Sequence, residues 1–230
     1  MILLDDSFVS ITHAIAQGRH IFYSLQRVIL YFFATNLGEI LIVMFALILG
    51  LPLPLTAVQI LWLNLVTDGF LDVALAMEPQ EAGLLESSWL KQKVHLVDRA
   101  MILQALYMAL PMALGSIIVF AYYTWYNVLL AQTMTLVLMA MFQWFNAWNC
   151  RSTKLSIFEL KLLGNVWLVG ATLLVFALQL MLVYVPFMQK IFDTVPLTLS
   201  QWLLIVAISS SIIVFEEIRK WVFKIKTFNR

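Results

Sequence analysis

The chain has 230 residues, of which 63% are hydrophobic and only 12% are charged, and its formal net charge is +1. Soluble domains carry about 25% charged residues, so the composition excludes an ordinary soluble protein and indicates one embedded in a bilayer. The near-zero net charge gives no basis for expecting a nucleic-acid partner, and the single cysteine, Cys150, excludes an internal disulfide.

Residues 1–25 are not apolar enough to span a membrane. Asp6 or Ser7 can cap a helix, and apolar residues then recur at helical spacing, as on the surface helix of a soluble domain. No proline occurs between Ser7 and Gly50, so this helix can continue into the first span. It would then be roughly 60 Å long, and the part that the bilayer does not need would project as a stalk.

Six apolar segments follow, each close to the 20 residues that a bilayer span requires. They cover approximately residues 27–49, 56–77, 100–122, 128–148, 165–186 and 200–218. The uncharged turn at 50–54 makes the first two spans a helical hairpin, and Pro111 should kink the third span. We therefore predict an all-α membrane protein with six transmembrane helices in a bundle, the first extended into a cytoplasmic stalk.

The Lys and Arg residues predict the orientation. With the N-terminus inside, every one of the 14 basic residues except Lys190 lies on the cytoplasmic side, in agreement with the positive-inside rule. Both termini are then cytoplasmic. The compact loops favour the bacterial plasma membrane for this integral, multi-pass protein.

Polar residues interrupt the second span near its middle. Asn64, Thr67, Asp68 and Asp72 all lie within it, although one carboxylate at the bilayer centre costs about 2.5–3.5 kcal/mol on translocon-insertion scales. Such residues are expected to face each other, a cavity or a cation. Gly69 follows directly after Asp68, so we predict a hinge there, at which the helix opens and turns carbonyl groups toward an ion.

The first span carries Asn36 and Glu39, which share a helix face at i and i+3. Because the two spans form a hairpin, residues near their midpoints meet at similar depth. The converging set offers two carboxylates, two amide oxygens and a hydroxyl, from Asn36, Glu39, Asn64, Thr67 and Asp68. Oxygen ligands suit a hard cation such as Ca²⁺ or Na⁺, and the lack of Cys or His pairs in the spans argues against copper and zinc.

Some of these residues have a simpler interpretation. Taken singly, Asn36, Thr67 or Gln143 is more readily explained as a hydrogen-bonding contact between helices. Glu39 together with Asp68 favours function, because paired carboxylates repel each other without a cation. Asp72 can be a ligand, a proton carrier or part of a water-filled entry path, so Asp72 and Gln143 are candidate accessory residues.

Two segments make the sequence resemble a known family. Residues 36–39 (NLGE) and 61–69 (LWLNLVTDG) closely resemble the fifth and sixth transmembrane helices of P-type cation ATPases, and of the calcium pumps in particular. The start, with residues 4–8 and Gly18-Arg19, resembles the end of the phosphorylation domain. The resemblance is specific over residues 1–80 and mostly topological over 100–230, and it covers the fifth to tenth helices of such a pump.

The resemblance implies a division of the chain and a transport function. Residues 1–25 would be the end of the phosphorylation domain and the stalk helix, and residues 26–79 the transmembrane hairpin with the cation site. A cytoplasmic loop (80–99), a four-helix transmembrane support bundle (100–222) and a basic cytoplasmic tail (223–230) would follow. The cargo implied is most strongly Ca²⁺, with Na⁺ or another cation as alternatives. The residues that match cation-coordinating positions are Asn36, Glu39, Asn64, Thr67 and Asp68.

The sequence also departs from the family pattern. Gln143 stands where two-site calcium pumps carry a glutamate ligand, so one of two sites would be weakened or absent. Asp72 stands where a small apolar residue is usual, so stoichiometry or proton countertransport can differ. Asn64, in contrast, resembles calcium pumps more than sodium/potassium pumps.

The phosphorylation motif, the nucleotide-binding domain, the actuator loop and the four preceding spans of the family do not occur in this sequence. We therefore expect no catalytic residue and no ATP hydrolysis by this chain alone, with ATP and Mg²⁺ acting only through the missing N-terminal part of a pump. That part and the lipid bilayer are the expected partners. A fragment, a truncated reading frame and half of a split pump are all compatible with this. The alternatives are an ATP-independent cation carrier or channel, and a non-transporting membrane scaffold left from a truncated pump.

Overall fold

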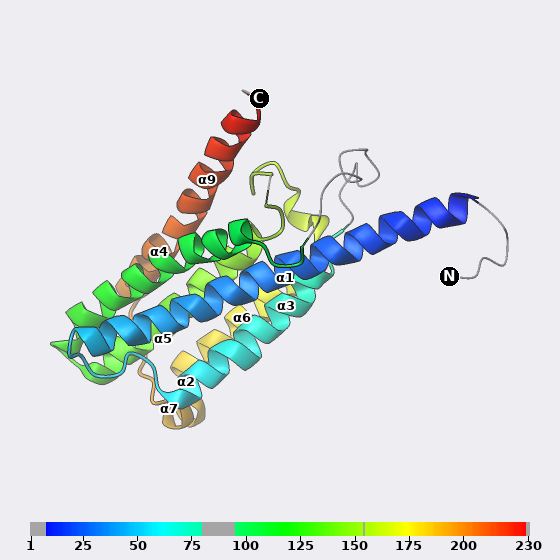
Figure 1. The fold of residues 1–230 in the computed structure, drawn as a ribbon. Helices are drawn as coiled ribbons and strands as arrows, with labels where there is room; N and C mark the ends of the chain where they lie inside the picture. Colours follow the sequence, from blue (N-terminus) through cyan, green and yellow to red (C-terminus); the bar gives the residue numbers. More distant parts are fainter. Residues whose placement is uncertain (1–7, 80–94, 154, 229–230) are drawn as a thin grey trace.

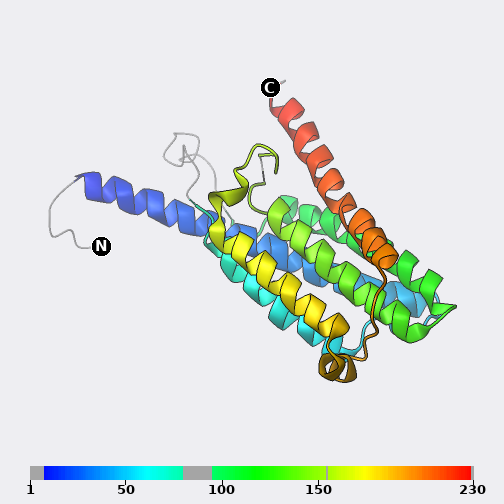
Figure 2. The same cartoon turned by 180° about the vertical axis from the view of Figure 1, so that it is seen from behind.

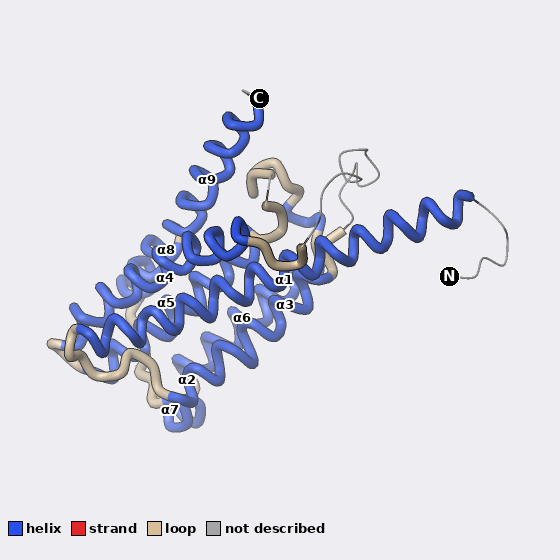
Figure 3. Tube along the Cα trace, in the orientation of Figure 1, coloured by secondary structure: helices blue, strands red, loops and turns tan. Residues whose placement is uncertain are grey.

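The computed structural model describes residues 8–79, 95–153 and 155–228. Within these residues there is no strand, and six helices are long and apolar enough to cross a membrane. Figure 3 shows that loops are confined to the ends of the helical bundle. The predicted all-α architecture with six spans is therefore confirmed, whereas the predicted cap at Asp6 or Ser7 and most of the loop 80–99 lie outside the described residues.

The first helix, α1 (Phe8–Ile48), runs without a break for 41 residues, which is about 61 Å at 1.5 Å per residue. Its first part projects from the bundle, as Figure 1 shows. We call this end of the bundle the stalk end, and the opposite end the turn end. At the turn end Gly50 adopts φ +67°, and the Leu51 N–H donates to the Ala46 carbonyl at 2.9 Å. This is the glycine-dependent helix stop of a Schellman motif.

The second span consists of three consecutive helical pieces. These are α2 (Ala57–Trp62), the π-helix η1 (Leu63–Asp68) and α3 (Gly69–Ala76). Thr56 and Gln59 start it with a capping box, in which each side chain accepts a hydrogen bond from the other residue's backbone N–H. The span runs antiparallel to α1 and lies beside it, so the predicted hairpin is present (Figure 1).

The other spans follow in sequence, and side-chain caps start three of them. They are α4 (Arg99–Thr124), α5 (Val128–Asn149), α6 (Val166–Tyr184), and α8 (Leu199–Ser209) with α9 (Ser211–Phe228). The caps are Asp98, Asn127 and Asn165, each accepting from the backbone N–H three residues later. Pro111 lies inside α4 without ending it. The short helices η3 (Leu162–Gly164) and α7 (Pro186–Phe192) flank α6.

The sixth span, expected as one segment, divides between α8 and α9. Ser209 Oγ donates to the Ile205 carbonyl at 2.7 Å, and Ser210 Oγ donates to the Ala207 carbonyl at 2.8 Å. Serine hydroxyls that bond back to the preceding turn bend helices. Beyond this point α9 diverges from the bundle (Figures 1 and 2).

The centre of the bundle is α5, whose stretch 134–142, apolar except for Thr135, is buried throughout. Its neighbours α1, α4, α6 and α8 surround it, with α6 beside the second span (Figure 2). Small residues permit close approach: an added Cβ at Gly115 of α4 would lie 3.0 Å from Ile208 Cγ2 and 3.0 Å from Phe142 Cζ. Three helices therefore meet at Gly115.

This contact yields a stability prediction. Gly115→Ala should lower the free energy of unfolding by about 1–3 kcal/mol, because the added methyl group overpacks the contact with Ile208 and Phe142. Thermal unfolding in detergent measures the effect. Gly170→Ala in α6 is the matched control, since a Cβ there meets no atom within 4 Å; equal unfolding temperatures for the two variants would contradict the packing.

Candidate cation site

The site begins with three α1 residues that recur every four positions: Tyr31, Thr35 and Glu39. Tyr31 and Thr35 contact Asp68, the last residue of η1. The Tyr31 hydroxyl donates to Asp68 Oδ1 at 2.7 Å, and the Thr35 hydroxyl donates to Asp68 Oδ2 at 3.1 Å. Asp68 is only 1% exposed, so its carboxyl group lies inside the hairpin against α1.

Glu39 lies one turn closer to the turn end and is also buried. Asn64 Nδ2, from η1, donates to Glu39 Oε2 at 2.9 Å. Gln143 Nε2, from α5, donates to Glu39 Oε1 at 2.9 Å. Three elements therefore meet at this carboxyl group, which binds the hairpin to the central helix.

The two carboxyl groups occupy successive positions along one helix interface. Because α1 and the second span are antiparallel, the earlier residue of α1 contacts the later residue of η1. Thr35 therefore contacts Asp68, and Glu39 contacts Asn64, one turn closer to the turn end. Glu39 and Asp68 are both buried in this interface, and Asp72 lies one helical turn beyond Asp68. Like charges removed from water repel strongly, and neutral hydrogen-bond donors offset only part of that cost. The arrangement therefore favours the arrival of positive charge.

The remaining predicted residues occupy different places. Thr67 is buried beside Asp68. Asn36 is half-buried, and its Nδ2 donates to the Phe32 carbonyl of its own helix at 2.9 Å, so the described contacts do not join it to either carboxyl group. Asp72 lies one turn from Asp68, and its Oδ1 is buried without a hydrogen-bond partner among the described residues.

The departure from α-helical geometry does not occur at Gly69 itself. Gly69 has ordinary helical angles, φ −57° and ψ −45°, and the irregular segment is the π-helix Leu63–Asp68 that precedes it. This segment carries Asn64, Thr67 and Asp68. Single-turn π segments within α-helices are frequent at functional sites, so the backbone and the polar side chains mark the same six residues. A hinge at Gly69 stays a prediction.

Sequence reasoning missed Tyr31 and Thr35, the two donors to Asp68. The sequence feature that could have identified them is their spacing: they precede Glu39 by eight and four residues, so all three polar side chains share one face of an otherwise apolar span. Gln143, first considered only as an accessory residue, contacts Glu39 directly.

The donor set fits a hard cation better than a soft one. Among residues 8–79, 95–153 and 155–228, no three His, Cys, Asp or Glu side chains gather as a metal-binding group. A cation here would thus need the amide and hydroxyl oxygens in addition to Glu39 and Asp68. Gln143 Oε1 is buried without a described partner, and rotating the Asn64 and Gln143 amides would turn their oxygens toward the carboxyl groups.

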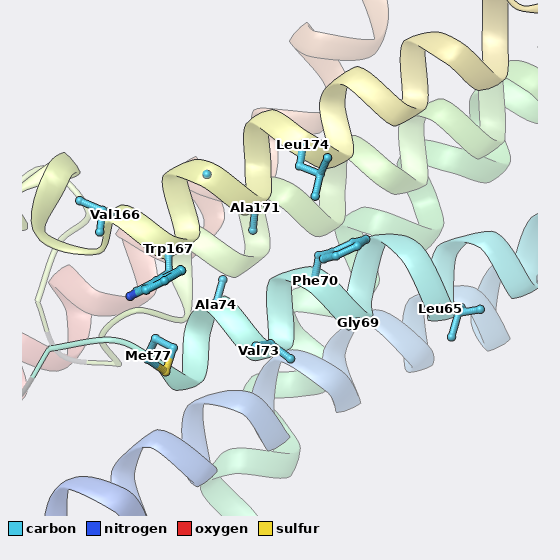
Figure 4. Close-up of a pocket in the computed structure, with 11 residues that line it drawn as sticks. Leu65, Gly69, Phe70, Val73, Ala74, Met77, Val166, Trp167, Ala171 and Leu174 are labelled. Atoms are coloured by element: carbon cyan, nitrogen blue, oxygen red, sulfur yellow. The ribbon is translucent and has the colours of Figure 1, made fainter.

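A large groove lies on another face of the second span. Its volume is about 720 Å³, and residues of η1, α3 and α6 line it (Figure 4). The lining is apolar, with Phe70, Trp167 and Leu174 among the larger side chains. It offers no oxygen ligands comparable to those of the hairpin, so it is not the cation site.

Comparison with known proteins identifies the family. Residues 52–222 match the family model described as "Cation transporting ATPase, C-terminus". The chain belongs to the C-terminal region of the P-type cation ATPases. This P-type ATPase region is, with its six apolar helices, an integral multi-pass membrane protein.

Several relatives of this P-type ATPase region have calcium-transport names. A "Calcium-transporting ATPase" of Bacillus subtilis is 35% identical over 214 residues, which are 91% of this chain and 24% of the relative. The "Endoplasmic reticulum calcium ATPase srcA" of Aspergillus fumigatus is 28% identical over 256 residues, 96% of this chain and 26% of the relative. A "Probable cation-transporting ATPase F" of Mycobacterium tuberculosis is 30% identical, over 92% of this chain and 24% of the relative. The chain thus spans about a quarter of the length of these relatives.

The buried carboxyl groups yield a second stability prediction. With a chelator present, Glu39→Gln should raise the unfolding temperature, by about 2–4 °C for each kcal/mol of repulsion removed. The Asn64 and Gln143 amides can rotate to satisfy the new amide group. Any rise in unfolding temperature that added Ca²⁺ produces in the unsubstituted protein should be lost in this variant. Thermal unfolding with and without Ca²⁺ measures both effects.

Glu159→Gln is the control for this substitution, because Glu159 is exposed and far along the chain from the hairpin. It should change neither quantity. A lower unfolding temperature for Glu39→Gln in chelator would show that the charge of Glu39 does not oppose folding.

Proposed function

We propose that this region binds a dehydrated cation between its first two spans and passes it across the membrane as part of an ATP-driven pump. The observation that carries the proposal is the placement of Glu39 and Asp68 on one buried interface between antiparallel spans. Ca²⁺ is the favoured cargo, because the oxygen donors suit it and because relatives are named calcium-transporting ATPases.

The proposed ligands come from three helices. Glu39 and Asp68 supply carboxylate oxygens, Asn64 and Gln143 supply amide oxygens once their amides rotate, and Thr67 supplies a hydroxyl. Ca²⁺ takes six to eight oxygen ligands, so backbone carbonyls of the π segment, Asn36 or Asp72 would complete the shell. The ion removes the repulsion between the carboxylates, which is the energetic gain of binding.

Gln143 bears on the number of ions. A neutral amide contacts Glu39 here, so two carboxylates balance one divalent cation. A second Ca²⁺ at the same depth would lack compensating charge and would repel the first. We therefore propose one divalent ion in the hairpin site per cycle.

The proposed coupling runs through α1. This helix is continuous from the stalk to Glu39, so a tilt of the stalk moves Tyr31, Thr35 and Glu39 together relative to Asp68. ATP and Mg²⁺ would act on domains in the N-terminal part of the pump, which with the first four spans is the proposed partner. Both termini are proposed to face the cytoplasm of a bacterial cell.

Asp68→Asn tests this function directly in a complete pump that contains this region. Cation-dependent phosphorylation by ATP should be abolished, because the amide can still accept from Tyr31 but cannot balance the charge of the ion. Phosphorylation is measured at rising Ca²⁺ concentrations.

The control for the phosphorylation assay is Asp193→Asn. Asp193 is exposed at the turn end with φ 49°, a conformation that asparagine tolerates. Its activity should equal that of the unsubstituted pump. Normal phosphorylation of the Asp68→Asn pump would remove Asp68 from the site.

A further inference from the structure

A second buried polar network lies at the stalk end of the second span, away from the cation site. Its centre is Glu78, two residues beyond α3 and 6% exposed. Arg151 Nε donates to both Glu78 carboxylate oxygens at 3.0 Å, and Arg151 Nη2 lies 2.9 Å from Glu78 Oε1. Arg151 is itself 2% exposed, so both charges are removed from water.

Asn165 connects this ion pair to α6. Its Nδ2 donates to Glu78 Oε2 at 2.8 Å and to the Ala74 carbonyl at 2.9 Å. Its Oδ1 accepts from the Leu168 N–H at 2.9 Å and so caps α6. One side chain therefore joins the last turn of α3 to the first turn of α6.

Arg151 connects the same ion pair to α5 and to the loop that follows it. The guanidinium lies over the Trp148 ring at 5.3 Å from its centroid, a cation–π contact. Arg151 Nη2 also donates to the Lys161 carbonyl at 3.2 Å. We call Glu78, Arg151 and Asn165 the Glu78 network; it joins the ends of α3 and α5 to the start of α6.

The second span is fixed at its other end too. Gln59 Nε2 donates to the Phe192 carbonyl at 2.8 Å, and Trp62 Nε1 donates to Gln179 Oε1 at 3.0 Å. Both contacts join α2 to the α6–α7 segment. The π-helix with Asn64 and Asp68 lies between these two sets of contacts, so its position relative to α6 is determined from both ends.

A buried ion pair is weak evidence for stability, because desolvation offsets much of the attraction. The directional hydrogen bonds of Asn165 to Glu78 and to the Ala74 carbonyl nevertheless fix the rotation of α3 about its axis and its position along that axis. Glu78 is ten residues from Asp68 along the chain, and the helix α3 (Gly69–Ala76) covers eight of those positions. The network is therefore placed to determine where Asp68 and Asn64 lie.

We propose that Glu78, Arg151 and Asn165 are positioning residues for the cation site. They fix α3 against α6, so that Asp68 and Asn64 form the stationary side of the site and α1 forms the side that moves. This inference rests on the proposed function of the hairpin. It gives the network a role in cation affinity that is separate from folding.

The chain contains a matched control. Glu216 and Arg219 of α9 form another ion pair, with Nη2 2.5 Å from Oε1; Glu216 is buried and Arg219 is partly exposed. Gln104 of α4 donates to Glu216, and Arg219 donates to the Thr153 carbonyl; neither partner belongs to the second span. Neutralising this pair should affect folding without reaching Asp68.

The test uses the complete pump and measures the Ca²⁺ concentration for half-maximal phosphorylation together with thermal stability. Glu78→Gln, and the double variant Glu78→Gln with Arg151→Gln, should raise that concentration by about 10–100-fold, as for other residues that orient ligands. The maximal phosphorylation should be retained. The double variant leaves no unpaired buried charge, so it keeps the test open if Glu78→Gln alone does not fold.

Glu216→Gln should leave the Ca²⁺ dependence unchanged, even where it lowers thermal stability by a similar amount. An unchanged Ca²⁺ dependence in both Glu78 variants, or an equal shift in Glu216→Gln, would overturn the positioning role. Asp68→Asn, assayed in parallel, distinguishes failure of the positioning role from failure of the proposed cation site. If Asp68→Asn abolishes phosphorylation while the Glu78 variants are normal, only the positioning role fails; if Asp68→Asn is normal, the hairpin site itself fails.

Discussion

The structure depends on the contact between two antiparallel helices that each carry a buried carboxyl group. Glu39 and Asp68 lie on one interface, and neutral donors from three helices surround them. This is costly in a membrane because the carboxylates repel each other and lack water. The other features serve this contact: α1 extends rigidly beyond it, α5 supports it through Gln143, and contacts with α6 and α7 fix both ends of the helix that bears Asp68.

The fold was largely predictable, because its determinants are local. Apolar segments of bilayer length predicted the six spans. The turn at Gly50 predicted the hairpin, because glycine adopts a positive φ without steric cost. The absence of proline before Gly50 gave the single long helix. The positions of Glu39 and Asp68 inside the spans predicted that they lie close together, because two charges buried in a membrane are expected to share a partner.

The rest depends on tertiary contacts that a sequence pattern does not encode. Tyr31 and Thr35 resemble ordinary core residues until the rotation of α1 against η1 is known. Predicting the π-helix Leu63–Asp68 required knowledge of how the whole second span packs against its neighbours. The pairing of Glu78 with Arg151 joins residues 73 positions apart, and no local rule connects a residue after one span with a residue after another.

The most direct test is the location of the ion in a structure of a complete pump, containing this region, determined with bound Ca²⁺. The account predicts one ion with oxygen atoms of both Glu39 and Asp68 within about 2.3–2.6 Å, the usual range for Ca²⁺. The Asn64 and Gln143 amides should have turned their oxygens toward it. An ion bound elsewhere, with Asn64 and Gln143 still donating to Glu39 and with Tyr31 still donating to Asp68, would contradict the account.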